Sequence, residues 1–376
     1  MVATRELTRR DFLRLSAGSV AALGMSLLDM PGFTKLLEAA VEEIPVLWLQ
    51  LASCTGCSVS ALNSLSPSIR NVLVNEVVPG KHVSLRYHTT VMGGAGDQAM
   101  KVIEDTARNK KGYVLVVEGA IPLKEDGVHC QIGERGGKGI SALEHTSRLG
   151  SDAMAVLALG TCAAYGGIPS ASPNPTGSVG VGEVFDRHGI KTPVINIPGC
   201  PSHPDWFIGT IASVLISGLG SVKLDHIGRP VAFFGQNIHE NCPRRGHFDA
   251  GRFAKGISEP YCLYELGCKG PVTNSDCPSR RWNASTNWCI GAGAPCIGCT
   301  EQGFPDAMSP LYNKVSNVSL PGINLTADRV GAALGVATTV GLGAHLIGNV
   351  ATGRFGRKKG ELNGDHNGES KQEGEE

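Results

Sequence analysis

Short apolar runs alternate with helical stretches between about residue 44 and residue 224. Four runs have the length of a buried strand: 46–52, 113–117, 154–159 and 193–197. Helical patterns follow the first run from Ser58 and the last from Trp206. This repetition of strand, loop and helix predicts an α/β fold, a parallel sheet with helices on its faces.

Cysteines stand directly after three of these strands. Cys54 and Cys57 follow the first strand, Cys162 follows the third and Cys200 follows the fourth. Ligands of parallel sheets bind outside the carboxyl ends of the strands, so the four thiols are expected to converge there. Such a set suits an iron–sulfur cluster or zinc. Each cysteine taken alone could instead be a small buried apolar residue, and the Cys54–Cys57 spacing alone also fits a redox dithiol.

The pattern changes near Asp225, where Gly, Pro, Asn and Cys replace regular periodicity. A segment with so little apolar surface is expected to be stabilised by bound metal. Its histidine and seven cysteines form two more four-ligand sets, which are His239, Cys242, Cys262 and Cys268, then Cys277, Cys289, Cys296 and Cys299. Cys130 is left over as an unpaired thiol without an assigned function. Three thiolate-rich sites suit iron–sulfur clusters or zinc.

Both ends of the chain differ from this body. Residues 1–43 contain Thr8-Arg9-Arg10-Asp11-Phe12-Leu13 and an uncharged run over 15–28 that is too short to span a bilayer. The arginine pair resembles a twin-arginine export signal, a route that carries proteins already folded around their cofactors. The alternative is an ordinary amphipathic helix.

A second apolar run, 330–350, is 21 residues long, which at about 1.5 Å per residue reaches the roughly 30 Å of a hydrocarbon core. Gly331 and Gly335 have the spacing of packed membrane helices, and a basic cluster follows over 354–359. We therefore expect a membrane anchor over 327–353 and a polar tail over 354–376. A buried helix of a soluble protein is the alternative, but its five glycines make it a poor one.

Composition narrows the function. The 376 residues carry 34 Lys+Arg and 34 Asp+Glu, and a net charge of zero argues against a nucleic-acid partner. Twelve cysteines are too many for a routine cytosolic enzyme. Several cluster-like sites without a nucleophile triad indicate an electron carrier with no catalytic residue of its own.

The cysteine motifs resemble those of a known family, the small iron–sulfur subunit of nickel–iron hydrogenases. The resemblance covers about 44–320 and both ends. The motifs that carry it include Cys54-Thr55-Gly56-Cys57, Val117-Glu118-Gly119-Ala120, Gly160-Thr161-Cys162-Ala163, Pro198-Gly199-Cys200-Pro201, His239-Glu240-Asn241-Cys242, Gly267-Cys268-Lys269-Gly270-Pro271 and Pro295-Cys296-Ile297-Gly298-Cys299.

The resemblance implies a flavodoxin-like domain over 44–224 and a loop-rich domain over 225–326 that binds two clusters. It assigns Cys54, Cys57, Cys162 and Cys200 to a proximal [4Fe–4S] cluster, His239, Cys242, Cys262 and Cys268 to a distal [4Fe–4S] cluster, and Cys277, Cys296 and Cys299 to a medial cluster. The nickel–iron centre would belong to a large subunit, the obligate partner. The implied activity is H2 = 2H+ + 2e−, with electrons passed to a membrane cytochrome b, another cytochrome or a quinone.

Two details of the sequence refine this picture. Many family members carry proline at the position of Cys289 and have a medial [3Fe–4S] cluster. Because Cys289 would supply the missing fourth ligand, we expect a medial [4Fe–4S] cluster here, as in the nickel–iron–selenium branch. If Cys289 is not a ligand, the medial cluster would be [3Fe–4S]. Thr55-Gly56 lacks the extra cysteine of oxygen-tolerant members, which predicts oxygen sensitivity. Glu76 and Glu118 are candidates for a proton path or for structural hydrogen bonding, which the sequence does not distinguish.

Two other classes of protein remain as alternatives. One is the cluster-bearing subunit of a complex I-type oxidoreductase, which lacks the two later sites and is not exported. The other is a non-catalytic zinc or disulfide protein.

Overall fold

The computed structural model describes residues 42–64, 81–108, 112–313, 318–320, 323–325 and 327–352. Three predictions lie outside the described residues: the export signal, except for its last two positions 42 and 43, the residue Glu76, and the polar tail. Contacts divide the chain into two compact units, one ending at Val315 and one beginning at Ser316. The predicted domain boundary at residue 225 falls inside the first unit and stays a prediction.

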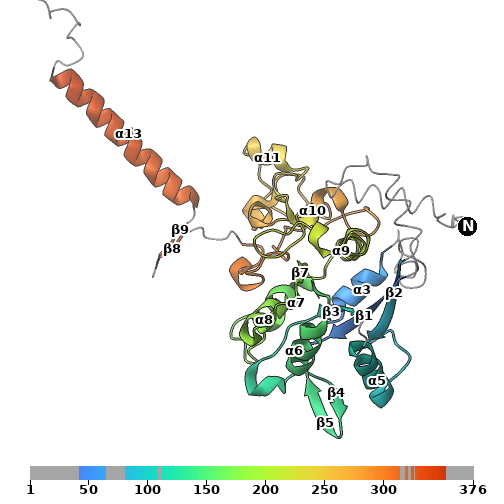
Figure 1. Ribbon diagram of the computed structural model, residues 1–376. Helices are drawn as coiled ribbons and strands as arrows, with labels where there is room; N and C mark the ends of the chain where they lie inside the picture. The colour runs from blue at the N-terminus through green and yellow to red at the C-terminus, as the bar shows by residue number, and fades with distance from the viewer. Residues whose placement is uncertain are drawn as a thin grey trace, which may run out of the picture. The chain divides into compact units, whose positions relative to one another are not determined.

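A five-stranded sheet forms the centre of the first unit (Figure 1). Its strands are β1 (Glu42–Gln50), β2 (Lys81–His88), β3 (Val114–Glu118), β6 (Ala155–Leu159) and β7 (Val194–Ile197). They lie in the order β2-β1-β3-β6-β7, and every neighbouring pair is parallel. With the five strands counted along the chain, this is the 2-1-3-4-5 order of flavodoxin-like folds, so the predicted fold class is confirmed. The point at which the order reverses lies between β1 and β3.

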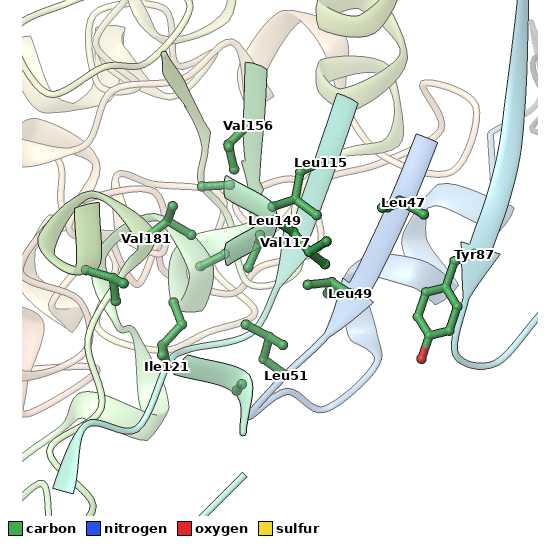
Figure 2. Close-up of a cluster of buried hydrophobic side chains, with 14 of the residues drawn as sticks. Leu47, Leu49, Leu51, Tyr87, Leu115, Val117, Ile121, Leu149, Val156 and Val181 are labelled. Atoms are coloured by element: carbon green, nitrogen blue, oxygen red, sulfur yellow. The ribbon is translucent and has the colours of Figure 1, made fainter. Parts of the chain in front are cut away.

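Helices cover both faces of this sheet. They are α3 (Gly56–Leu62), α5 (Gly96–Ala107), α6 (Ala142–Asp152), α7 (Gly160–Tyr165), α8 (Val181–His188) and α9 (Pro204–Ser217). Alternate strand residues point to opposite faces, so Trp48 packs in one core with Trp206 of α9 while Leu47 packs in the other with Leu149 of α6. Figure 2 shows the second core, in which side chains of β1 lie beside those of β3.

Burial on both faces explains why the sequence predicted some strands and not others. The central strands β3 and β6 are buried along their whole length and therefore read as continuous apolar runs. Strand β2 lies at the edge of the sheet and has the mixed sequence KHVSLRYH, so the apolar pattern did not predict it. The hairpin of β4 (Gln131–Arg135) and β5 (Lys138–Ser141) is largely exposed and was missed for the same reason.

Local signals fix where several helices begin and end. The hydroxyl of Ser141 accepts a hydrogen bond from the backbone N–H of Glu144 at 3.1 Å, which caps the first turn of α6. Helix α9 starts with Pro204, whose missing N–H costs nothing at that position. Gly189 ends α8 in the left-handed conformation, with φ of 66°.

The segment over 218–313 consists of loops and single turns. Its short elements are η4 (Leu219–Ser221), α10 (Val231–Phe234), α11 (Arg245–Asp249), η5 (Leu263–Leu266), η6 (Gly270–Val272), α12 (Cys277–Arg280) and η7 (Asp306–Met308). Two similar turns, η2 (Lys124–Gly127) and η3 (Ile168–Ser170), lie earlier in the chain. Helix α9 holds this segment to the sheet, because the indole N–H of Trp206 donates to Asp276 at 2.7 Å.

The second unit contains the hairpin of β8 (Val318–Leu320) and β9 (Ile323–Leu325), followed by helix α13 (Ala327–Ala351). Within α13, Ala332–Ala351 is long and apolar enough to cross a membrane, and none of it is buried in protein. This is the one such helix among the described residues, and it lies within the predicted anchor.

Candidate functional site: three groups of thiols

The structure brings the four predicted thiols at the strand ends together beside the reversal point of the sheet. Cys54 follows β1, Cys57 is in the first turn of α3, Cys162 is in α7 and Cys200 follows β7. Burial raises the pKa of Cys57 well above its ordinary value, and the charges of Cys162 and Cys200 raise it further. Burial, with smaller effects of Cys200 and Cys54, raises the pKa of Cys162 to about 11. The four sulfurs are therefore close enough to act on one another.

Glycines line the space around these sulfurs. A Cβ atom added to Gly160, where φ is +86°, would lie 2.5 Å from Sγ of Cys57. One added to Gly56 would lie 3.1 Å from Sγ of Cys54, and one added to Gly167 would lie 3.0 Å from Sγ of Cys162. The backbone thus approaches the thiols where a side chain would collide with them.

The buried carboxylate of Glu118, at the end of β3, holds the loop that carries Cys54 and Cys57. It accepts hydrogen bonds from the backbone N–H groups of Cys57 at 3.1 Å and Ser58 at 3.2 Å. It also accepts from the indole N–H of Trp48 at 3.1 Å and from the hydroxyl of Ser58. A carboxylate at this place satisfies the free N–H groups at the start of α3. This is the structural role that the sequence could not separate from a proton path.

A polar network extends from Ser58 into the core. The Ser58 hydroxyl accepts from the side-chain amide of Gln50 at 2.8 Å and lies 3.1 Å from Nε2 of His88. Nδ1 of His88 accepts from the backbone N–H of Thr90 at 3.1 Å, so Nε2 carries the proton of the neutral ring. Burial lowers the pKa of His88, although the Glu118 charge opposes this. No signal in the sequence indicates this network, because its members come from three separate strands and from helix α3.

A second group of thiols surrounds one cavity in the loop-rich segment. The cavity has a volume of about 450 Å3, and apolar side chains including Ile238, Trp282 and Trp288 line it. Its cysteines are Cys200, Cys277, Cys289, Cys296 and Cys299. Burial raises the pKa of the last four of these thiols, to about 11 for Cys277 and about 12 for Cys299. The structure therefore places Cys289 beside the three cysteines with which the sequence grouped it.

The third group is Cys242, Cys262, Cys268 and His239. Burial raises the pKa of each thiol, and their charges act on one another. Burial also lowers the pKa of His239, whose Nε2 atom is buried without a hydrogen-bond partner among the described residues. The Phe248 ring packs nearly perpendicular to the imidazole, with the two ring centroids 4.5 Å apart. The backbone N–H of Cys242 donates to the carbonyl of His239 at 3.4 Å, and a buried nitrogen without a partner fits a site that takes an electrophile such as iron.

The three groups form a row in which each touches the next. The charge of Cys200, in the first group, acts on Cys299 in the second. The hydroxyl of Thr161 also links these two groups, since it accepts from Gly199 N–H at 2.8 Å and donates to the carbonyl of Cys299. Cys268, in the third group, acts on Cys296 in the second. The residue after Cys268, Lys269, donates its backbone N–H to the carbonyl of Cys296 at 2.7 Å.

All twelve cysteines are free thiols. Within the described ranges no three His, Cys, Asp or Glu side chains are arranged to hold a single metal ion. Cys130 lies apart, partly buried against the core of Leu149, and burial raises its pKa. The ligand roles stay a prediction.

Two models of known protein families match separate parts of the chain. The family model for the C-terminal part of the NiFe/NiFeSe hydrogenase small subunit matches residues 234–312, and the model "NADH ubiquinone oxidoreductase, 20 Kd subunit" matches residues 54–214. The first covers the two later thiol groups, and the second covers the strand-end thiols and four of the five strands of the sheet, since β1 lies before it.

Two similar curated proteins match almost over their full length. The chain is 42% identical to the periplasmic [NiFeSe] hydrogenase small subunit of Desulfomicrobium baculatum, over 81% of this chain and 98% of that protein. It is 37% identical to the quinone-reactive Ni/Fe-hydrogenase small chain of Wolinella succinogenes, over 92% of this chain and 97% of that one. Among solved structures, it is similar to the [NiFeSe] hydrogenase from Desulfovibrio vulgaris Hildenborough, with a TM-score of 0.68 and 45% identity over 74% of this chain and 99% of the other.

Proposed function

The chain belongs to the small-subunit family of nickel–iron hydrogenases, and on that premise we propose that it relays electrons through three iron–sulfur clusters between the large subunit and an acceptor at the membrane. Small subunits of this family pair with a nickel–iron large subunit, so the hydrogen chemistry takes place on another chain. The alternative of a complex I-type subunit is disfavoured, because the hydrogenase relatives match both halves of the chain.

In this proposal each thiol group holds one cluster, and a bound cluster supplies one-electron transfer. The proximal ligands are Cys54, Cys57, Cys162 and Cys200, the medial ligands are Cys277, Cys289, Cys296 and Cys299, and the distal ligands are His239, Cys242, Cys262 and Cys268. The observation that carries the proposal is the row of thiol groups, linked through Cys200 to Cys299 and through Cys268 to Cys296. Neighbouring sites in a row suit the passage of electrons from one end of the subunit to the other.

The chain's own residues prepare these sites. Burial disfavours the thiolates of the free chain, and bound iron offsets this cost because its positive charge stabilises them. Glu118 fixes the loop of Cys54 and Cys57, while the glycines beside the sulfurs let the thiols lie against the backbone. Cys289 supports a medial [4Fe–4S] cluster, since its thiol lines the same cavity as the other three medial ligands.

We further propose that the subunit is exported by the twin-arginine route and anchored by α13, facing the periplasm or cell exterior. The length and exposed apolar surface of Ala332–Ala351 support an anchor. A cytochrome b, another cytochrome or a quinone would then accept the electrons, in agreement with the similarity to the quinone-reactive hydrogenase small chain of Wolinella succinogenes. The Thr55-Gly56 pair, without an extra cysteine, supports an ordinary, oxygen-sensitive proximal site.

The test is iron and acid-labile sulfide analysis with EPR on the heterodimer purified from membranes without oxygen. We expect about thirteen irons per heterodimer, twelve in the three clusters and one in the nickel–iron centre, and no strong three-iron signal from the oxidised protein. The Cys289→Ala variant should lose about one iron and gain a three-iron signal, and Cys130→Ala, the matched control, should resemble the wild type. Colourless protein containing zinc would contradict the relay, and a strong three-iron signal in the wild type would contradict the medial assignment alone.

A further inference from the structure

Four Asp, Glu, Lys or Arg side chains are buried in the described part of the chain, and two of them have no ion-pair partner there. Arg229 pairs with carboxylates at 2.7 and 3.0 Å, and Asp276 pairs with Arg280 at 2.8 Å. Glu118 and Lys269, each only 2% exposed, form hydrogen bonds to neutral groups instead. Burying a charge without a counter-charge is costly, so two such groups beside the thiol sites suggest a function.

The hydrogen bonds of Glu118 identify it as an ionised carboxylate. The indole N–H of Trp48 and the backbone N–H groups of Cys57 and Ser58 can only donate. The Ser58 hydroxyl accepts from both Gln50 and Nε2 of His88 and therefore directs its own proton toward Glu118. A group that only accepts hydrogen bonds has no place for a proton. This negative charge is in contact with the backbone of Cys57, one of the proposed proximal ligands.

Lys269 lies at the junction of the other two sites. It follows Cys268 in the chain, and its backbone N–H donates to the carbonyl of Cys296 at 2.7 Å. Its ammonium group donates to the carbonyl of Asn313 and is close enough for its charge to interact with both thiols. The positive charge therefore acts on the proposed medial and distal sites together.

We propose that Glu118 and Lys269 form a fixed charge gradient along the relay, which makes an electron less favourable at the proximal site and more favourable at the medial and distal sites. The inference rests on the proposed function. A reduced cluster carries one more negative charge than an oxidised one, so a nearby anion lowers its potential and a nearby cation raises it.

The step that this gradient assists is the movement of one electron from the proximal to the medial site. No bond forms or breaks, and no proton is taken up by the two side chains. The gradient favours electron exit from the large subunit, the direction of hydrogen oxidation. It does not change the overall hydrogen equilibrium, which depends only on the couples at the two ends.

The test is an EPR-monitored redox titration of the intact heterodimer carrying Lys269→Met, which removes the charge and keeps the length of the side chain. We expect the medial and distal midpoint potentials to fall by at least about 59 mV, equivalent to a tenfold change in a one-electron equilibrium. The proximal potential should change less. Lys269→Arg, the matched control that keeps the charge, should leave the potentials near those of the wild type.

Glu118→Gln removes the negative charge instead, so it should raise the midpoint potential of the proximal cluster and leave that of the distal cluster unchanged. If either variant fails to assemble, the wild type still tests the proposal, since its proximal cluster must have the lowest potential of the three. Unchanged potentials in iron-replete Lys269→Met, or a proximal potential above the other two in the wild type, would overturn this inference alone. Wild-type protein without iron would overturn the proposed function and the inference with it.

Discussion

Replacing Gly160 with alanine tests how closely the backbone approaches the Cys57 sulfur. The new Cβ atom would lie 2.5 Å from Sγ of Cys57, well inside van der Waals contact. The substitution also places a side chain on a residue with φ of +86°, outside the range that L-residues adopt readily. Both effects act on the first turn of α7, which carries Cys162.

The size of the effect follows from these two costs. Left-handed backbone costs a non-glycine residue roughly 1–2 kcal/mol. Inserting a methyl group into a packed site costs about 1–3 kcal/mol more. Together they predict a loss of about 2–5 kcal/mol in the free energy of unfolding. With an unfolding entropy of about 2.1 cal/mol/K per residue over 376 residues, the melting temperature should fall by about 3–6 °C. Displacement of the Cys57 sulfur should also lower the iron content, because that thiol is a proposed ligand.

The assay combines thermal unfolding of the purified heterodimer with iron per small subunit. Gly182→Ala is the matched control, since Gly182 lies in helix α8, has no positive φ and has open space around its added Cβ. Alanine there should be neutral or stabilising by up to about 1 kcal/mol. A Gly160→Ala protein with the melting temperature and iron content of the wild type would refute this close approach.

Three further predictions concern other parts of the chain. Arg229→Met should lower the free energy of unfolding by about 3–5 kcal/mol at pH 7, because it leaves buried carboxylates unpaired. The exposed control Arg187→Met should lower it by at most about 0.5 kcal/mol. Burial of Asp225 raises its pKa, but hydrogen bonds and charge from Arg229 outweigh this and hold the pKa below its usual range. The stabilisation from this pair is therefore present above the unfolded pKa of about 3.9 and is lost as the pH falls through the lower folded pKa. The loss of unfolding free energy in Arg229→Met should accordingly be smaller at pH 3 than at pH 7. His239→Ala should slow acceptor reduction but spare hydrogen/deuterium exchange at the large subunit, and equal loss of both would contradict a distal role. A chain ending before Ala327 should appear in the soluble fraction with its hydrogen/deuterium exchange intact, and retention in washed membranes would argue against α13 as the anchor.

The sequence determined the central strands and the helices behind them, because burial on both faces requires continuous apolar residues that can be recognised locally. It also predicted how the thiols group, since short spacings and positions after strands are linear properties of the chain. Strand β2 was missed because an edge strand tolerates polar residues such as Lys81 and Arg86.

Only the tertiary structure decided which groups surround those thiols. The hydrogen bonds of Glu118 join residues 60 or more positions apart, and the contact of Lys269 with Cys296 joins two loops. Local patterns carry no information about such contacts, because they arise when the sheet closes and the loops pack on it. The sequence therefore determined where the thiols stand along the chain, while the fold decided which buried charges act on them.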